Sequence, residues 1–177
     1  MVVVADTSPI NYLVLIAEID LLEQLYARIL IPPAVLAELR HPAAPQPVRD
    51  WAESEPKWVE VLTPKSSLML AQLDPGESEA IALATEVHAE VVLIDERAGR
   101  QEALRRGLKV AGTLSVLDEA DQAGLVVFDS ALAELRKTSF RVSQAVLSEV
   151  RGKTISPPMD VFPVATLEQR FSQAQTK

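Results

Sequence analysis

Short apolar runs that alternate with helical segments set the strongest limit on how this chain can fold. Most of the runs lack the strict polar–apolar alternation of a sheet with one wet face. Helical segments separate them along almost the whole chain. This order predicts an α/β fold, Rossmann-like and three-layered (α/β/α), with a central parallel sheet and a C-terminal helical extension. The expected strands are residues 2–5, 28–31, 58–62, 91–94 and 108–112.

Local signals predict where the helices begin. Ser8 is a typical N-cap with Pro9 at the first helical position, so a helix is expected from there to about residue 17. The strongest helix signal is residues 73–90, where Asp74 can act as the cap and Glu77 lies three residues later. The other expected helices are residues 20–27, 33–40, 48–55, 96–106, 113–125, 129–137 and 143–152.

Composition excludes several classes of protein. The chain has 177 residues, of which 48% are hydrophobic, so it can bury a core. It has no cysteine and only two histidines, which excludes disulfides, thiol nucleophiles and zinc sites built on those residues. We find neither a signal peptide nor a membrane-spanning run and expect a soluble cytoplasmic protein. The net charge of −8 argues against a generic DNA-coating protein. One domain is expected over residues 1–152, with a tail or peripheral arm over 153–177.

Two aspartates directly follow apolar strand runs. Asp6 follows the first run and Asp95 follows the fourth. In parallel α/β sheets, ligands bind beyond the carboxyl ends of the strands, near the point where strand order reverses. If the two strands are neighbours, both carboxylates meet at one mouth, although either residue alone is more typical of a turn or a helix cap.

Two glutamates compete for a place at the same mouth. Glu77 heads the apolar stripe of its helix, with Ala80, Ile81 and Ala84, and should point toward the strand ends. Glu79 lies about 200° further round the helix and is expected to face solvent. We therefore prefer Glu77, whose competing role is that of a capping-box residue.

Crowded carboxylates repel one another unless a cation lies among them. Without cysteine or a histidine cluster, oxygen ligands favour Mg²⁺ or Mn²⁺, which can activate water and offset charge on a phosphodiester. Thr7 and Ser8 offer hydroxyls nearby, although helix capping is their ordinary role. Glu38 borders the buried face of its helix, and the pattern alone suggests a solvated glutamate.

Four stretches in order are similar to the PIN-domain family of metal-dependent ribonucleases: "VVADTSPI", "IPPAVLAEL", "GESEAIALA" and "VVLIDERAGR". A following "GLKVAGTLSVL" also resembles PIN domains, and the likeness covers about residues 2–128. The resemblance implies a PIN-like nuclease domain over 1–152. Its acidic positions, catalytic and binding Mg²⁺ or Mn²⁺, fall on Asp6, Glu38, Glu77 and Asp95.

The resemblance carries further expectations. The hydroxyl position falls on Thr7 or Ser8. The third acidic residue is often an aspartate in the family, and here Glu79 lies close to Glu77 as an alternative. Glu96 can replace or assist the residue before it. Many prokaryotic members resemble the toxin of a type II toxin–antitoxin pair, which implies a possible antitoxin partner and a homodimer.

Basic residues gather just after the fourth strand. Arg97 and Arg100 begin a helix whose N-terminus borders the acidic mouth, so they are candidates to bind RNA phosphates. A solvated helix face explains them equally well. Aromatic residues are few, so we expect few contacts to bases.

The leading hypothesis is a divalent-metal-dependent endoribonuclease. The alternative is a catalytically inactive PIN-like module that binds nucleic acid or assembles complexes. A phosphoryl-transfer enzyme or receiver domain ranks low, because Thr7 and Ser8 occupy the places where such proteins carry a second acidic residue.

Overall fold

Five parallel strands form the central sheet of the protein. The structure is a computed structural model and describes residues 1–66 and 72–152. The strand order is β3-β2-β1-β4-β5, and every neighbouring pair is parallel. The predicted parallel α/β fold is therefore confirmed. The strands are β1 (Val3–Ala5), β2 (Ile29–Ile31), β3 (Val59–Val61), β4 (Val91–Leu93) and β5 (Val110–Ala111).

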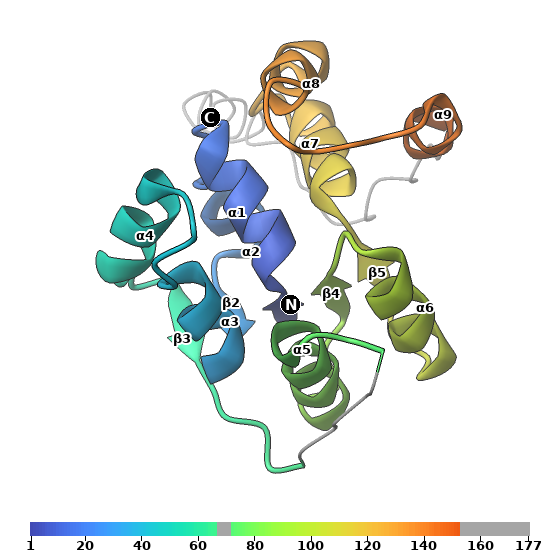
Figure 1. Cartoon of the computed structure of the whole chain (residues 1–177). Coiled ribbons are helices and arrows are strands. Elements are labelled where there is room, and N and C mark those ends of the chain that lie inside the picture. The colour runs from blue at the N-terminus through green and yellow to red at the C-terminus, as the bar shows by residue number, and fades with distance from the viewer. Residues whose placement is uncertain (67–71, 153–177) are drawn as a thin grey trace, which may run out of the picture.

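Helices fill the intervals between the strands and follow the last one (Figure 1). Among the described residues they are α1 (Thr7–Leu15), α2 (Leu21–Tyr26), α3 (Pro33–Leu39), α4 (Gln46–Glu53), α5 (Pro75–Glu86), α6 (Arg97–Arg105), α7 (Thr113–Gln122), α8 (Phe128–Leu135) and α9 (Gln144–Gly152). No helix in this part of the chain is long and apolar enough to cross a membrane.

The sheet separates two apolar cores, which makes three layers. Successive side chains of a strand point to opposite faces, and in β1 Val3 and Ala5 join one core whereas Val4 joins the other. The larger core contains residues of α1, α2, α3, α4, α7 and α8. The smaller core contains residues of α5 and α6. Both faces of the inner strands β1, β2 and β4 are therefore covered, as their apolar character requires. The edge strand β3 is partly exposed.

The start of α1 differs from the prediction. Ser8 is not the N-cap: the helix begins at Thr7, and Asp6 occupies the cap position with extended backbone angles, φ −83° and ψ 171°. Pro9 still lies in the first turn, where its missing N–H costs no helical hydrogen bond. The helix therefore begins directly at the carboxylate that ends the strand.

Other helix boundaries also differ from the prediction. Helix α4 begins at Gln46 rather than at residue 48, because Pro47 is accommodated in its first turn. Helix α5 ends at Glu86, four residues before the predicted end. The predicted tail, residues 153–177, lies outside the described residues.

The strand order places a topological switch point between β1 and β4. From β1 the chain proceeds to β2 and then β3 on one side, and it returns to β4 and β5 on the other. Ligands of open α/β sheets bind at such a point, beyond the carboxyl ends of the strands. Asp6 and Asp95 flank this position, as the neighbouring β1 and β4 strands require.

Candidate functional site

Asp6 lies at the centre of the switch point. Its backbone N–H donates to the Leu93 carbonyl at 2.9 Å, and the residue is only 2% exposed. Burial raises its pKa well above the ordinary value; the Thr7 backbone N–H opposes this rise, and neighbouring carboxylates add to it. The buried Oδ1 atom has no hydrogen-bond partner among the described residues. Such an orphaned carboxylate oxygen is costly unless a cation or another group satisfies it.

Glu38 is held against Asp6 from helix α3. The Thr7 hydroxyl donates to Glu38 Oε2, and the Gly76 N–H donates to Glu38 Oε1 at 2.9 Å. A Cβ atom at Gly76 would lie 2.6 Å from Glu38 Oε2, so a glycine is required for this close approach. Only the family resemblance pointed to Glu38, because its partners lie on segments distant in sequence.

Asp74 forms an acidic cluster with Asp6 and Glu38. The sequence analysis did not predict this role for Asp74. Asp6, Glu38 and Asp74 each present an oxygen, and these atoms all lie within 4.8 Å of one another. The sequence reasoning gave Asp74 a capping role only. That role is confirmed, because its side chain accepts from the Glu77 N–H at 2.7 Å in a full capping box. The cap therefore also brings a carboxylate to the strand ends.

Glu77 and Glu79 have different surroundings on α5. Glu77 is 4% exposed, and its Oε1 atom has no hydrogen-bond partner in the described part of the chain. Glu79 was predicted to face solvent. Its carboxylate instead accepts a hydrogen bond from the Ala34 N–H at 3.0 Å. Helix α5 packs on α3 as well as on the sheet, so its second face is also covered. Glu79 thereby satisfies the N-terminus of α3.

Glu77, like Asp6 at the end of β1, has a raised pKa. Burial raises the pKa of Glu77 to about 7. The charges of Asp74, Glu96 and Glu38 contribute to this rise, and the hydrogen bond from the Asp74 backbone opposes it. A Cβ atom at Gly99 would lie 2.7 Å from Glu77 Oε1, so α6 closes tightly over this carboxylate. Orphaned buried oxygens, raised pKa values and an all-oxygen donor set are together what a hard divalent cation satisfies. The residues present fit such an ion.

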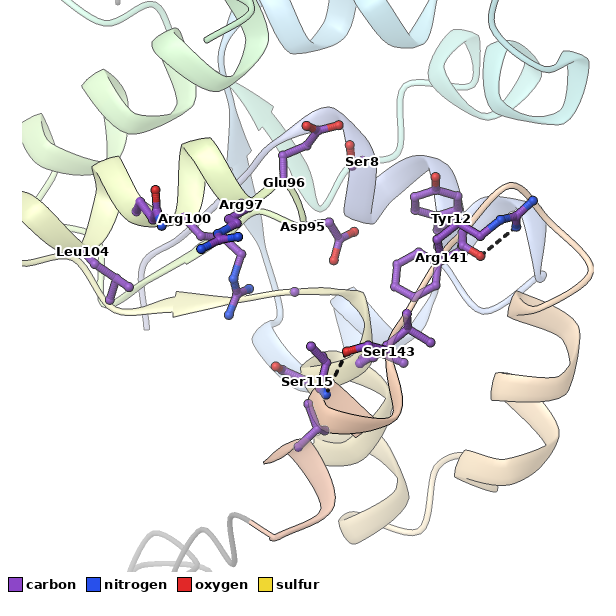
Figure 2. Close-up of a pocket in the computed structure, with 17 residues that line it drawn as sticks. Ser8, Tyr12, Asp95, Glu96, Arg97, Arg100, Leu104, Ser115, Arg141 and Ser143 are labelled. Carbon is purple, nitrogen blue, oxygen red and sulfur yellow. Dashed lines mark hydrogen bonds between the residues drawn. The ribbon is translucent and has the colours of Figure 1, made fainter. Parts of the chain in front are cut away.

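The Asp95 carboxylate is held by Thr113, at the start of α7. Its carboxylate accepts from the Thr113 N–H at 2.8 Å and from the Thr113 hydroxyl at 2.6 Å. Burial raises the pKa of Asp95, and the two bonds from Thr113 oppose that rise. Asp95 and Glu96 point in opposite directions from the β4–α6 junction, and Glu96 points toward the start of α1 (Figure 2). Glu96 is thus the member of this pair whose charge acts on Glu77.

The two arginines predicted to bind RNA stand at the start of α6. Arg100 donates to the Ile94 carbonyl at 2.9 Å and lies beside Asp95, whose pKa it lowers. Arg97 is exposed. Neither forms an ion pair with a described residue. Ser8, the other hydroxyl candidate, lines the same hollow as these arginines.

Solved structures with a similar arrangement include two proteins of low sequence identity. One is a PilT N-terminus domain protein from the hyperthermophilic archaeon Sulfolobus solfataricus P2, with 14% identity and a TM-score of 0.48, over 81% of this chain and 100% of that chain. The other is the PIN domain endonuclease Utp24, with 18% identity and a TM-score of 0.47, over 63% of this chain and 84% of that chain. No curated protein matches the sequence.

A family model gives the assignment. The PIN-domain model matches residues 2–155, which is most of the chain and includes every acidic residue described above. Members of this family are generally nucleases that use divalent metals. The chain therefore belongs to the PIN-domain family.

Proposed function

We propose that the protein is a Mg²⁺- or Mn²⁺-dependent endoribonuclease that hydrolyses RNA phosphodiester bonds at the acidic cluster. The observation that carries the proposal is the pair of buried carboxylate oxygens, one on Asp6 and one on Glu77, that have no partner among the described residues. Neither carboxylate forms an ion pair with a described residue. A structural role would be better served by neutral side chains, because unpaired buried carboxylates destabilise a fold.

Asp6, Glu38 and Asp74 each present an oxygen within 4.8 Å of the others and would hold the cation. We assign Glu77, whose buried Oε1 atom has no partner among the described residues, as a fourth ligand. When bound, a divalent cation lowers the pKa of water and offsets negative charge on a phosphodiester. The chain's own contribution is to orient these donors. Thr7 and Gly76 fix the two oxygens of Glu38, and Gly99 limits where Glu77 can lie.

Asp95 and Glu96 complete the proposed site in different ways. Asp95, fixed by Thr113, ties the end of β4 to the start of α7 and lies beside Arg100. We assign it to the side of the site that meets the substrate phosphates and their arginines. Glu96 acts electrostatically on Glu77 and is the better candidate for a further ligand of the cation.

The experiment compares cleavage of a mixed single-stranded RNA in Mn²⁺, in Mg²⁺ and in EDTA. Cleavage is expected with either metal and not in EDTA. A matched substrate with 2′-deoxy residues at the mapped cleavage sites identifies the nucleophile, because attack by water does not need the 2′-hydroxyl. Cleavage in EDTA, or cleavage that requires the 2′-hydroxyl, would contradict the proposal.

A biological role follows from family membership and is part of the same proposal. The protein would act in the cytoplasm as a homodimeric toxin of a type II pair, restrained by an antitoxin that covers the acidic cluster. Induced expression of the wild type should arrest growth, and Asp6→Asn should not. Light scattering tests the dimer. Normal growth despite soluble, active nuclease would refute the toxin role and leave the chemistry intact.

A further inference from the structure

A hollow of about 520 Å³ adjoins the acidic cluster. Its wall comes from α1, the β4–α6 junction, the start of α7, the loop before α9 and α9 itself (Figure 2). Its lining includes Glu96, whose charge acts on Glu77, and Ser8, whose neighbour Thr7 donates to Glu38. Its volume is within the range of about 300–1,000 Å³ that small-ligand sites occupy. The hollow therefore lies beside the residues that surround the acidic cluster.

Positive charge gathers in this hollow although the chain carries a net charge of −8. Arg97, Arg100 and Arg141 line it. Among the described residues, none of the three takes part in an ion pair. The Arg141 guanidinium donates to the carbonyls of Thr138 and Phe140 at 3.1 and 3.0 Å, which anchors it at the rim. Arg100 lies beside Asp95, whereas Arg97 and Arg141 have no carboxylate partner among the described residues. Such arginines suit phosphate groups, which they can bind with two parallel hydrogen bonds.

An aromatic pair forms another part of the wall. The rings of Tyr12 and Phe140 meet edge to face, with centroids 4.9 Å apart and planes at 83°. Both are partly exposed and both line the hollow. The Tyr12 hydroxyl lies 3.4 Å from Ser139 Oγ. Figure 2 shows Tyr12 and Arg141 on one side of the hollow and Arg97 on the other, with Asp95 between them. Aromatic side chains beside cationic ones are the elements that bind single-stranded nucleic acid.

We propose that this hollow binds one nucleotide of single-stranded RNA next to the cleaved bond, with its base against Tyr12 and Phe140 and its flanking phosphates on Arg97 and Arg141. The proposal rests on the nuclease function above and names a substrate subsite for it. A single stacked base is consistent with the expectation of few base contacts.

The charges favour RNA over a peptide. Leu104 and Val146 give the hollow exposed apolar surface that a peptide could also contact. An apolar peptide, however, would cover Arg97 and Arg141 without giving them an anionic partner, which costs free energy. Phosphates satisfy them, and the acidic cluster at the end of the hollow already calls for a phosphodiester substrate.

The test measures binding of a short, fluorescent single-stranded RNA to the full chain by anisotropy, in EDTA so that no cleavage occurs. Tyr12→Leu and Phe140→Leu keep apolar bulk and remove the stacking face; each should weaken binding about fivefold or more. Arg97→Gln should weaken binding and lower the salt dependence by about one phosphate contact. Arg136→Gln removes an exposed arginine outside the hollow and should bind like the wild type.

Photo-crosslinking of unmodified protein to RNA that carries 4-thiouridine removes any dependence on how the variants fold. The expected adduct maps to Tyr12 or Phe140. Wild-type affinity in all three hollow variants, or adducts confined to other surfaces, would overturn the subsite and leave the hollow to a peptide partner.

These outcomes separate the subsite from the nuclease. Metal-dependent cleavage with unchanged binding by the hollow variants would overturn the subsite alone. The predicted pattern of weakened binding, without cleavage in any metal, would support the subsite and refute the nuclease.

Discussion

Glu77→Gln should stabilise the metal-free protein at alkaline pH. The substitution keeps the size of the side chain and an acceptor for the Asp74 N–H, and it removes the charge. Burial raises the pKa of Glu77 from 4.5 to about 7, so the folded protein binds this proton more tightly than the unfolded chain does. The contribution of Glu77 to the stability of the wild type is therefore fully present below pH 4.5 and is lost as the pH rises from 4.5 through about 7.

The magnitude follows from that interval. At about 1.4 kcal/mol per pKa unit, ionised Glu77 costs the fold roughly 3 kcal/mol at pH 8. A neutral glutamine avoids most of this cost, so the free energy of unfolding should rise by about 2–3 kcal/mol. For a chain of this size the melting temperature should increase by roughly 4–10 °C. At pH 5, where wild-type Glu77 is mostly protonated, the two proteins should melt within about 2 °C of each other.

Thermal unfolding in EDTA at pH 5 and pH 8 measures the effect. Glu79→Gln is the matched control, because Glu79 lies on the same helix and its oxygen accepts one backbone bond that glutamine can also accept. The reasoning is refuted if Glu77→Gln gives no gain at pH 8, or if the gain is the same at pH 5, or if the control shows it equally.

Three further predictions concern the cation and the residues that position the carboxylates. Excess Mn²⁺ should stabilise the wild type by about 2.7 kcal/mol at a concentration 100 times its Kd, seen as a rise in melting temperature; no rise would argue against a site. Gly99→Ala places a Cβ atom 2.7 Å from Glu77 Oε1, and it should therefore weaken Mn²⁺ binding, measured by calorimetry, roughly tenfold. Gly152→Ala is the control: the space around Gly152 is open, so this substitution should leave the Mn²⁺ affinity unchanged. Thr113→Val deletes the hydroxyl donor to Asp95 and should lower the free energy of unfolding by about 1–3 kcal/mol in urea; an unchanged midpoint would show that the backbone bond alone suffices.

Much of the fold could be predicted because its signals are local. Short apolar runs such as residues 91–94 identified the strands, and the capping box at Asp74 and Glu77 identified α5. The side of α5 on which Glu77 lies could also be predicted, because Glu77 heads the apolar stripe of that helix. Helical periodicity carries that information without any tertiary contact.

Features that depend on contacts between residues distant in sequence could not be predicted. Glu79 reaches the N-terminus of α3, 45 residues earlier in the chain, and Asp95 turns to Thr113, 18 residues later. Asp74 was hidden as a metal-ligand candidate because one residue serves as both cap and cluster member. The predicted cap at Ser8 was wrong because Asp6, two positions nearer the strand, has an extended backbone and occupies the cap position.

The central claim is that the acidic cluster around Asp6 cleaves RNA, and the initial rate of RNA cleavage in Mn²⁺ tests it most directly. Asp6→Asn should lower the rate at least about 100-fold while the protein stays folded. Asp118→Asn is the control, because Asp118 is also a buried aspartate but lies on α7, where it accepts from Gln122; it should cleave at nearly the wild-type rate. Equal rates for wild type and Asp6→Asn, from proteins purified in parallel, would contradict the account.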